Sequence, residues 1–276
     1  QPLNHTPLWR VLAHSGQSPS CPMEKPLRTP RPWPYPRRIA HRGAGLLAPE
    51  NTLAAFRLGA GLGWRMFECD AKLSADGVVF LLHDDTLDRT TSGHGPAAAL
   101  PWSALRQLDA GGWHSPGFTG ETLPTLAAVA GFCLAHGLLL NIEIKPSPGL
   151  ARETGASVAR EAQRLWSAAA GATPPLLSSF QPEALDAARA AVPELPRGLL
   201  LESLWAGWLA SARELGCCAV IADHTQWTAA ALAEARAAGL RTLAYTVNDI
   251  DEAQKLEDWG LDGLITDAVD RFSPAA

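Results

Sequence analysis

Residues 65–73 carry the stretch RMFECDAKL, and a second stretch of the same kind, LLLNIEIK, ends at Lys145. Both predict buried strands. Alternate residues of a strand point to the same face, so Glu68 and Asp70 project together from the first strand, and Glu143 projects with the lysine from the second. Burying three carboxylates is costly unless a cation compensates them. The two strands therefore indicate a divalent metal site, and the lysine beside it indicates an anionic ligand.

From residue 37 onward, short apolar runs alternate with stretches of helical spacing. This alternation indicates βα units and a parallel sheet. Seven or more such units in about 235 residues favour a (β/α)8 TIM barrel over an open sheet. The predicted strands are 37–41, 65–73, 78–83, 138–145, 175–180, 197–202, 218–223, 241–247 and 262–266. The predicted helices are 51–62, 124–136, 150–170, 182–191, 204–215, 227–238 and 250–259.

The barrel is expected to be slightly irregular, because nine strands are predicted rather than eight. The second and third are separated by Ser-Ala-Asp-Gly at 74–77, and Asp-Gly is a hairpin signal. A hairpin there would bring His83 level with Glu68 or Asp70. Residues 84–123 then carry several turn signals and one weak helical piece, so they predict a small subdomain inserted after the third strand, where selectivity commonly resides.

Composition excludes several classes of protein. The 276 residues are 47% hydrophobic and 18% charged, enough for a sizeable core. The net charge of −5 and the lack of a basic run argue against nucleic acid as a partner. No apolar run reaches the roughly 18 residues of a membrane-spanning helix, so stable membrane insertion is not expected. Five cysteines without a CxxC pair predict reduced thiols in a cytoplasmic protein.

The amino-terminal residues differ from the rest of the chain. Residues 1–35 are rich in proline and lack the apolar region of a signal peptide. We expect them to form a partly disordered extension, followed by one barrel domain at residues 36–276. Met23 is the only methionine of the extension, which leaves open whether residues 1–22 are native. The sequence gives no indication of the oligomeric state.

Charged residues gather where the first four predicted strands end, and the carboxyl-terminal strand ends of a (β/α)8 barrel build its active site. Carboxylate ligation suits Mg²⁺ or Ca²⁺, with Mn²⁺ as a third option, rather than Zn²⁺. Arginine and lysine can donate to phosphate oxygens, and two histidines can act as general acid and base. The set predicts phosphoryl transfer to water or a hydroxyl. Its members are His41, Arg42, Glu68, Asp70, His83, Glu143 and Lys145.

The PENT stretch at residues 49–52 follows the first of these strands. Asn51 or Thr52 is a suitable N-cap for the next helix. Glu50 has two interpretations that the sequence leaves open. It either supports Arg42 or the metal, or it complements the positive end of the helix dipole.

Several of these segments together resemble the glycerophosphodiester phosphodiesterases, above all the bacterial cytosolic branch associated with glycerol 3-phosphate uptake. The resemblance covers about residues 35–270. Its central segments are IAHRG at 39–43, PENT at 49–52, ECDA at 68–71, HD at 83–84 and EIKP at 143–146. Further segments are LDRTT at 87–91, LDAG at 108–111, PPLLSSF at 174–180, YTVN at 245–248 and GLITD at 263–267.

The resemblance implies a (β/α)8 barrel that hydrolyses small glycerophosphodiesters to sn-glycerol 3-phosphate and an alcohol. It implies His41 and His83 as the acid–base pair and assigns the metal to the three carboxylates. Arg42 and Lys145 would bind the phosphate. An apolar wall near the glycerol would come from Phe180 and from Tyr245, where many members carry tryptophan.

Two other functions remain as alternatives. Related barrels cleave intact phospholipids, which requires an apolar or basic membrane face. Of ten scattered tryptophans, only Trp205 and Trp208 are close enough to share a helix face. A non-catalytic phosphate-binding barrel would be favoured by the loss of a histidine or a metal carboxylate, and none is missing.

Overall fold

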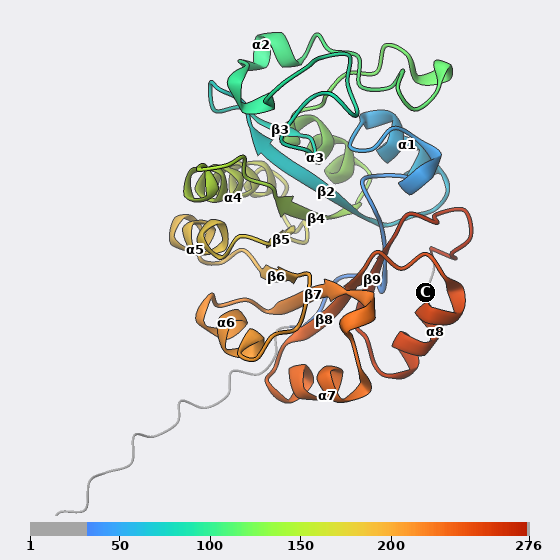
Figure 1. The fold of residues 1–276 in the computed structure, drawn as a ribbon, viewed down its shortest axis with the longest axis vertical. Helices are drawn as coiled ribbons and strands as arrows, with labels where there is room; N and C mark the ends of the chain where they lie inside the picture. Colours follow the sequence, from blue (N-terminus) through green and yellow to red (C-terminus); the bar gives the residue numbers. More distant parts are fainter. Residues whose placement is uncertain (1–31, 275–276) are drawn as a thin grey trace, which may run out of the picture. The chain divides into compact units, whose positions relative to one another are not determined.

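A computed structural model describes residues 32–274 of the chain. Eight of its strands run parallel: β1 (Arg38–Ala40), β2 (Met66–Leu73), β4 (Leu139–Ile144), β5 (Leu176–Ser179), β6 (Arg197–Leu201), β7 (Ala219–Asp223), β8 (Arg241–Tyr245) and β9 (Gly263–Thr266). They close into a barrel because β1 pairs with both β2 and β9. Helices surround the strands (Figure 1), which confirms the predicted (β/α)8 barrel.

The helices between the strands are α1 (Leu53–Gly61), α3 (Leu126–Ala135), α4 (Ala151–Ser167), α5 (Pro182–Ala191), α6 (Trp208–Glu214), α7 (Ala229–Ala237) and α8 (Ile250–Asp258). A side-chain cap starts several of them. Thr52 accepts a hydrogen bond from the backbone N–H of Ala55 and is the N-cap of α1. Asn51, the other candidate, hydrogen-bonds to Asp70 instead. None of the described helices has the length and apolarity needed to cross a membrane.

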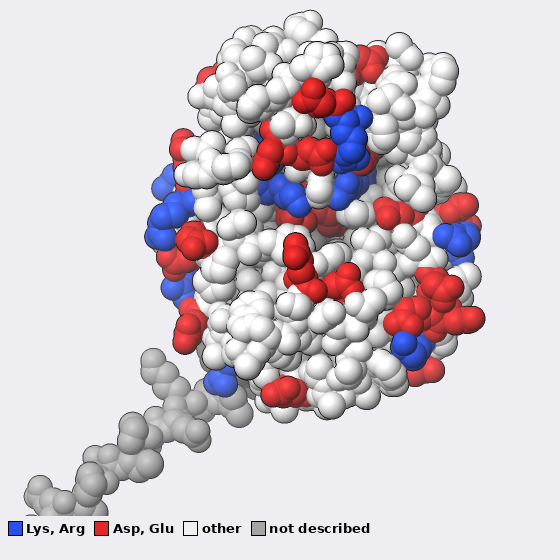
Figure 2. All heavy atoms as spheres, viewed as in Figure 1, with Lys and Arg blue, Asp and Glu red and all other residues white. Residues whose placement is uncertain are grey.

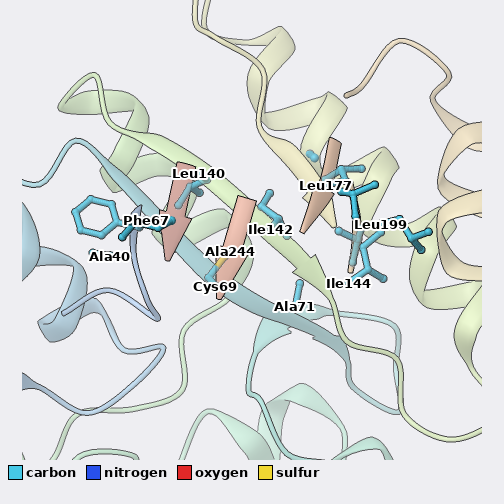
Figure 3. Packing of buried hydrophobic residues seen from close by; sticks show 14 of the residues in the cluster. Ala40, Phe67, Cys69, Ala71, Leu140, Ile142, Ile144, Leu177, Leu199 and Ala244 are labelled. Atoms are coloured by element: carbon cyan, nitrogen blue, oxygen red, sulfur yellow. The ribbon is translucent and has the colours of Figure 1, made fainter. Parts of the chain in front are cut away.

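Alternate residues of β2 face opposite sides of the barrel wall. One set packs against the helices in the hydrophobic core, and the other set points into the barrel interior. Phe67, Cys69 and Ala71 of β2 face the helices, and Figure 3 shows them beside outward-facing apolar residues of β4. The intervening residues of β2 therefore point into the barrel, although their sequence neighbours are apolar. Within residues 32–274, Cys69, Cys133 and Cys217 are free thiols.

A second apolar cluster fills the base of the barrel. It includes Ile39, Met66, Ile221 and Leu243 from four strands. Tyr35 packs into this cluster and donates a hydrogen bond to the Pro174 carbonyl, 2.8 Å away. The rest of the predicted extension, residues 1–31, lies outside the described residues.

The ninth strand, β3 (Val79–Leu81), pairs antiparallel with β2 and lies outside the closed barrel. The predicted hairpin is thus confirmed. Between β3 and α3 lies the insertion, which contains α2 (Trp102–Leu105) and stands over one side of the barrel in Figure 1. A bridge between Phe80 and Thr125 brings its two ends together. The insertion packs on Phe80 of β3 around a small core of its own, which consists of Leu82, Leu87, Ala97, Leu105, Ala110 and Leu123.

Candidate active site

Three buried carboxylates meet inside the barrel mouth. Asp70 of β2 lies directly opposite Glu143 of β4 in the strand register, and Glu68 precedes Asp70 on the same face. One oxygen from each of the three lies within 4.8 Å of the others. Two buried oxygens, Oε1 of Glu68 and Oδ1 of Asp70, have no hydrogen-bond partner. The structure brings together the three carboxylates that the sequence singled out as metal ligands.

The pKa shifts show that the three carboxylates do not all ionise at their ordinary pH values without a compensating cation. Burial, followed by the charges of Asp70 and Glu143, raises the pKa of Glu68 well above its usual range. Burial and then Asp70 raise the pKa of Glu143 to about 7. Burial also acts to raise the pKa of Asp70, but Arg42 and other cations lower it to about 2. An all-oxygen set with two unpartnered oxygens, in which burial disfavours the ionised forms of Glu68 and Glu143, fits a hard divalent cation.

The loop after β1 places His41 and Arg42 beside these carboxylates. Arg42 has a φ of 52° and Gly43 a φ of 103°, so the chain turns sharply through the left-handed region. The backbone N–H of Arg42 donates to Oε2 of Glu68 at 3.2 Å. In the side chain of Arg42, Nε lies 3.2 Å from Oδ2 of Asp70. At Gly45 a Cβ would overlap the backbone of Asp267, so only glycine lets the loop lie this close to the end of β9.

His41 is oriented by a carboxylate from the other end of the chain. Its Nδ1 lies 2.6 Å from Oδ1 of Asp267, and its Nε2 lies 3.6 Å from Oε2 of Glu68. Burial would raise the pKa of Asp267, but its hydrogen bond to His41 and the charge of His41 lower it. Sequence reasoning assigned no role to Asp267. The available signal was its position just after the last strand, at the catalytic end of the barrel.

His83 follows β3 and reaches the same mouth. Its Nδ1 lies 2.7 Å from Oδ1 of Asp84, and its Nε2 lies 2.9 Å from Nζ of Lys145. Burial is the main cause that lowers the pKa of His83, with Arg42 and Lys145 also lowering it. Lys145 donates to Glu143 at 3.1 Å as well, so it links the histidine to the carboxylate cluster.

A chain of ion pairs ties the insertion to the loop after β1. Glu50 accepts from Arg42 at 2.9 Å and from Arg89 at 2.8 Å. Arg89 belongs to the insertion and also donates to Asp84 at 2.7 Å, which lowers the pKa of Asp84. Glu50 therefore supports Arg42 and lies outside the carboxylate trio. Sequence reasoning missed Arg89, because nothing in an irregular segment predicts which face it reaches.

A cavity of about 570 Å³ opens over the carboxylates. Figure 2 shows acidic and basic side chains gathered in this hollow below the insertion. Phe180 and Tyr245 form one wall, with their rings edge to face at 5.7 Å, and Lys145 lies over the Phe180 ring. The predicted residues that line the cavity are His41, Arg42, Glu68, His83, Glu143, Lys145, Phe180 and Tyr245.

Comparison with known proteins gives one consistent family. The model of the glycerophosphoryl diester phosphodiesterase family matches residues 41–271. The protein YhdW of Bacillus subtilis is 33% identical, over 84% of this chain and 94% of that protein. A glycerophosphodiester phosphodiesterase of Caldanaerobacter subterraneus is 29% identical over 83% of this chain and 93% of its own.

A solved structure of an Oleispira antarctica phosphodiesterase, in complex with the product sn-glycerol 3-phosphate, superposes with a TM-score of 0.80. It is 36% identical and covers 86% of this chain and 94% of its own.

Proposed function

As a member of the glycerophosphoryl diester phosphodiesterase family, to which this chain belongs, the protein is a phosphoric diester hydrolase, and we propose how its site works. Glycerophosphodiesters are cleaved to sn-glycerol 3-phosphate and an alcohol, with a divalent metal bound by the three carboxylates. The observation that carries this proposal is the buried trio with two unpartnered oxygens below two carboxylate-bound histidines.

Glu68, Asp70 and Glu143 would hold the metal. Mg²⁺ or Ca²⁺ suits this oxygen set, and Mn²⁺ is a third option. When bound, such an ion neutralises the carboxylates and polarises a phosphoryl oxygen. Arg42 and Lys145 donate to the remaining phosphate oxygens, and Phe180 and Tyr245 cover the glycerol moiety.

His41 and His83 handle the protons. Each has its Nδ1 against a carboxylate, Asp267 or Asp84, so Nε2 is the nitrogen that would transfer the proton. At His83 this nitrogen would exchange its contact with Nζ of Lys145 for the substrate, whose phosphate Lys145 would bind. One histidine takes a proton from the attacking oxygen, and the other donates one to the leaving alcohol. The attacker is either water or the glycerol 2-hydroxyl, which would give a cyclic phosphate. Rapid-quench detection of that cyclic product distinguishes the two routes.

The catalytic domain that we propose is residues 36–276, with residues 1–35 as an extension. A phospholipase acting on membranes has less support from the surface. Trp205 is half-exposed, but Trp208 is buried against Trp227, so the two do not form an exposed aromatic face.

The first test is release of glycerol 3-phosphate from glycerophosphocholine by chelator-treated protein, with Mg²⁺, Ca²⁺ or Mn²⁺ added back singly. Release that returns with a metal supports the reaction and the metal site together. If a folded protein releases nothing from any glycerophosphodiester with any of the metals, the proposal is wrong. Full activity without metal would refute the metal role alone.

A further inference from the structure

We propose that Lys72 is a positioning residue of the active site, whose buried ammonium group sets the spacing between His83 and Lys145. This inference rests on the proposed function and adds a residue to its machinery. Lys72 follows Asp70 by two positions on β2, so its side chain leaves the strand on the same, inward side as the carboxylates. That side chain is 0% exposed and does not line the cavity over the carboxylates.

The ammonium group joins two segments that are distant in the sequence. Nζ of Lys72 donates to Oδ1 of Asp85 at 2.9 Å and to the backbone carbonyl of Lys145 at 3.1 Å. Asp85 comes two residues after His83, and Lys145 directly follows β4. An ammonium is a compact group with three donors, so one Nζ can hold both acceptors. Lys72 thus links the turn that carries His83 to the strand end that carries Lys145.

The strand end at Lys145 is held by β2 through both of its backbone polar groups. The N–H of Lys145 donates to the Ala71 carbonyl at 2.9 Å, and its own carbonyl accepts from Nζ of Lys72, the next residue of β2. The backbone of Lys145 therefore has a defined position. Its side chain starts from that point to reach Nε2 of His83 at 2.9 Å and Oε1 of Glu143 at 3.1 Å.

The turn at residues 83–85 lies outside helices and strands, so side chains contribute to its position. The backbone carbonyl of Asp85 accepts from the Ala97 N–H at 2.9 Å, which ties the turn to the insertion. The bond from Lys72 to the carboxylate of Asp85 ties the same turn to the barrel. Because the turn is bonded to both, the imidazole of His83 stays level with the end of β4.

The burial of this ammonium group argues for a role in geometry. Taking a charge out of water is costly, and a buried ion pair is often no more stable than well-packed apolar side chains of similar volume. A methionine could fill the space of Lys72 without that cost, but it offers no donor to the turn or the strand end. Asp85 is 54% exposed, so water can solvate its carboxylate when the lysine is removed. Removal of either partner therefore tests the link in a chain that should still fold.

The first test is the kinetics of Lys72→Met and Asp85→Ala with glycerophosphocholine at saturating metal. Each variant should lower kcat about tenfold or more, because small displacements of reacting groups are costly. KM should change by less than about threefold, because Arg42 still binds the phosphate.

Asp88→Ala is the matched control for Asp85→Ala. It removes a carboxylate of the same segment that is 51% exposed and pairs with His94 rather than with Lys72. Its kcat should stay within about twofold of the wild type, as is usual for a surface substitution.

A spectroscopic measurement separates positioning from a general loss of structure. In the metal-free protein, at a pH where the imidazole is neutral, the nitrogen NMR resonance of Nε2 of His83 reports the hydrogen bond from Lys145. It should move toward the position of a nitrogen without a hydrogen bond in Lys72→Met and Asp85→Ala, and stay in place in Asp88→Ala. In a His83→Ala background, Lys72→Met should cause no further loss of kcat, whereas a general loss of structure would add to it.

The outcomes distinguish this inference from the function on which it rests. If the wild type hydrolyses no glycerophosphodiester, the proposed function fails and this inference with it. If the wild type is active and both variants keep its kcat and its His83 resonance, the inference is wrong while the proposed function stands. A loss of kcat with an unchanged resonance, or an equal loss from Lys72→Met with and without His83, would also overturn it, because the lysine would then act by another route.

Discussion

Nζ of Lys145 lies 2.9 Å from Nε2 of His83, although both groups are able to carry a positive charge. A lysine ammonium has only donors, so Nε2 must be the acceptor and the imidazole is neutral. The ring proton is then on Nδ1, which donates to Asp84 at 2.7 Å. The contact thus sets both the charge and the tautomer of His83.

Replacing that lysine should make His83 easier to protonate. Burial is the first cause of its lowered pKa, and Lys145 adds to the effect. Lys145→Met removes a nearby positive charge, so the pKa of His83 should rise toward its ordinary value. An NMR titration of the imidazole in the metal-free protein measures this. Lys255→Met on α8 is the control, and an unchanged or lower pKa in Lys145→Met would contradict the assignment.

The two cavity histidines should be needed for turnover. His41→Ala and His83→Ala should each lower kcat by about 10²- to 10⁴-fold, the usual size of an acid–base contribution. Steady-state kinetics at saturating metal measures the loss. His94→Ala is a matched control, because this exposed histidine of the insertion also pairs with a carboxylate, Asp88. Full activity of a folded His83→Ala would remove that residue from the mechanism.

Asp267 should act through His41 rather than on the substrate. Asp267→Asn keeps the shape but offers an amide in place of the carboxylate that lies 2.6 Å from Nδ1. It should lower kcat about tenfold or more with little change in KM, because the ring loses its preferred tautomer. The double variant with His41→Ala should be no worse than His41→Ala alone. Additive losses would show that Asp267 acts independently.

The metal-free protein should lose stability as the pH rises. Burial raises the pKa of Glu143 from an ordinary 4.5 to about 7, so the folded state holds a proton that the unfolded state has already lost. That contribution is full below about pH 4.5 and disappears as the pH passes about 7. Thermal unfolding of chelator-treated protein between pH 5 and about 8 measures it.

The substitution Glu143→Gln tests the origin of this pH dependence. It should make the curve less steep, since the amide does not titrate while Glu68, whose pKa burial also raises, still does, and it should also raise the metal concentration needed for activity. Asp70 does not contribute to the slope of stability against pH in this range, because its pKa of about 2 places its titration at much lower pH. A curve equally steep in Glu143→Gln would assign the effect to another group.

Many of the side chains at the barrel mouth could be predicted, because the alternation of inward and outward residues along a strand is a local property of the sequence. Alternation alone places Glu68 and Asp70 on the inner face of β2, and the Asp-Gly turn alone predicts the hairpin that carries His83. The partners of those groups depend on closure of the fold. Asp267 is 226 residues from His41, and only the pairing of β1 with β9 makes them neighbours.

Other features were ambiguous at the level of single residues. Asn51 and Thr52 are equally good helix caps by residue type. The structure uses Thr52 as the cap because the φ of 59° at Asn51 turns its side chain toward Asp70. Arg89 bridges Asp84 and Glu50 from a segment without periodicity, so no pattern indicates its direction.

The bridge between Phe80 and Thr125 has a practical consequence for engineering this scaffold. A segment whose two ends lie side by side can be exchanged for another without reopening the barrel, because loop-closure entropy changes only slowly with segment length. A graft that begins after Arg89 and ends before Thr122 would bring a new wall to the insertion side of the barrel mouth and would keep His83, Asp84 and Arg89 in the chain. The insertion and the histidine-bearing strand ends could then be changed independently in one protein.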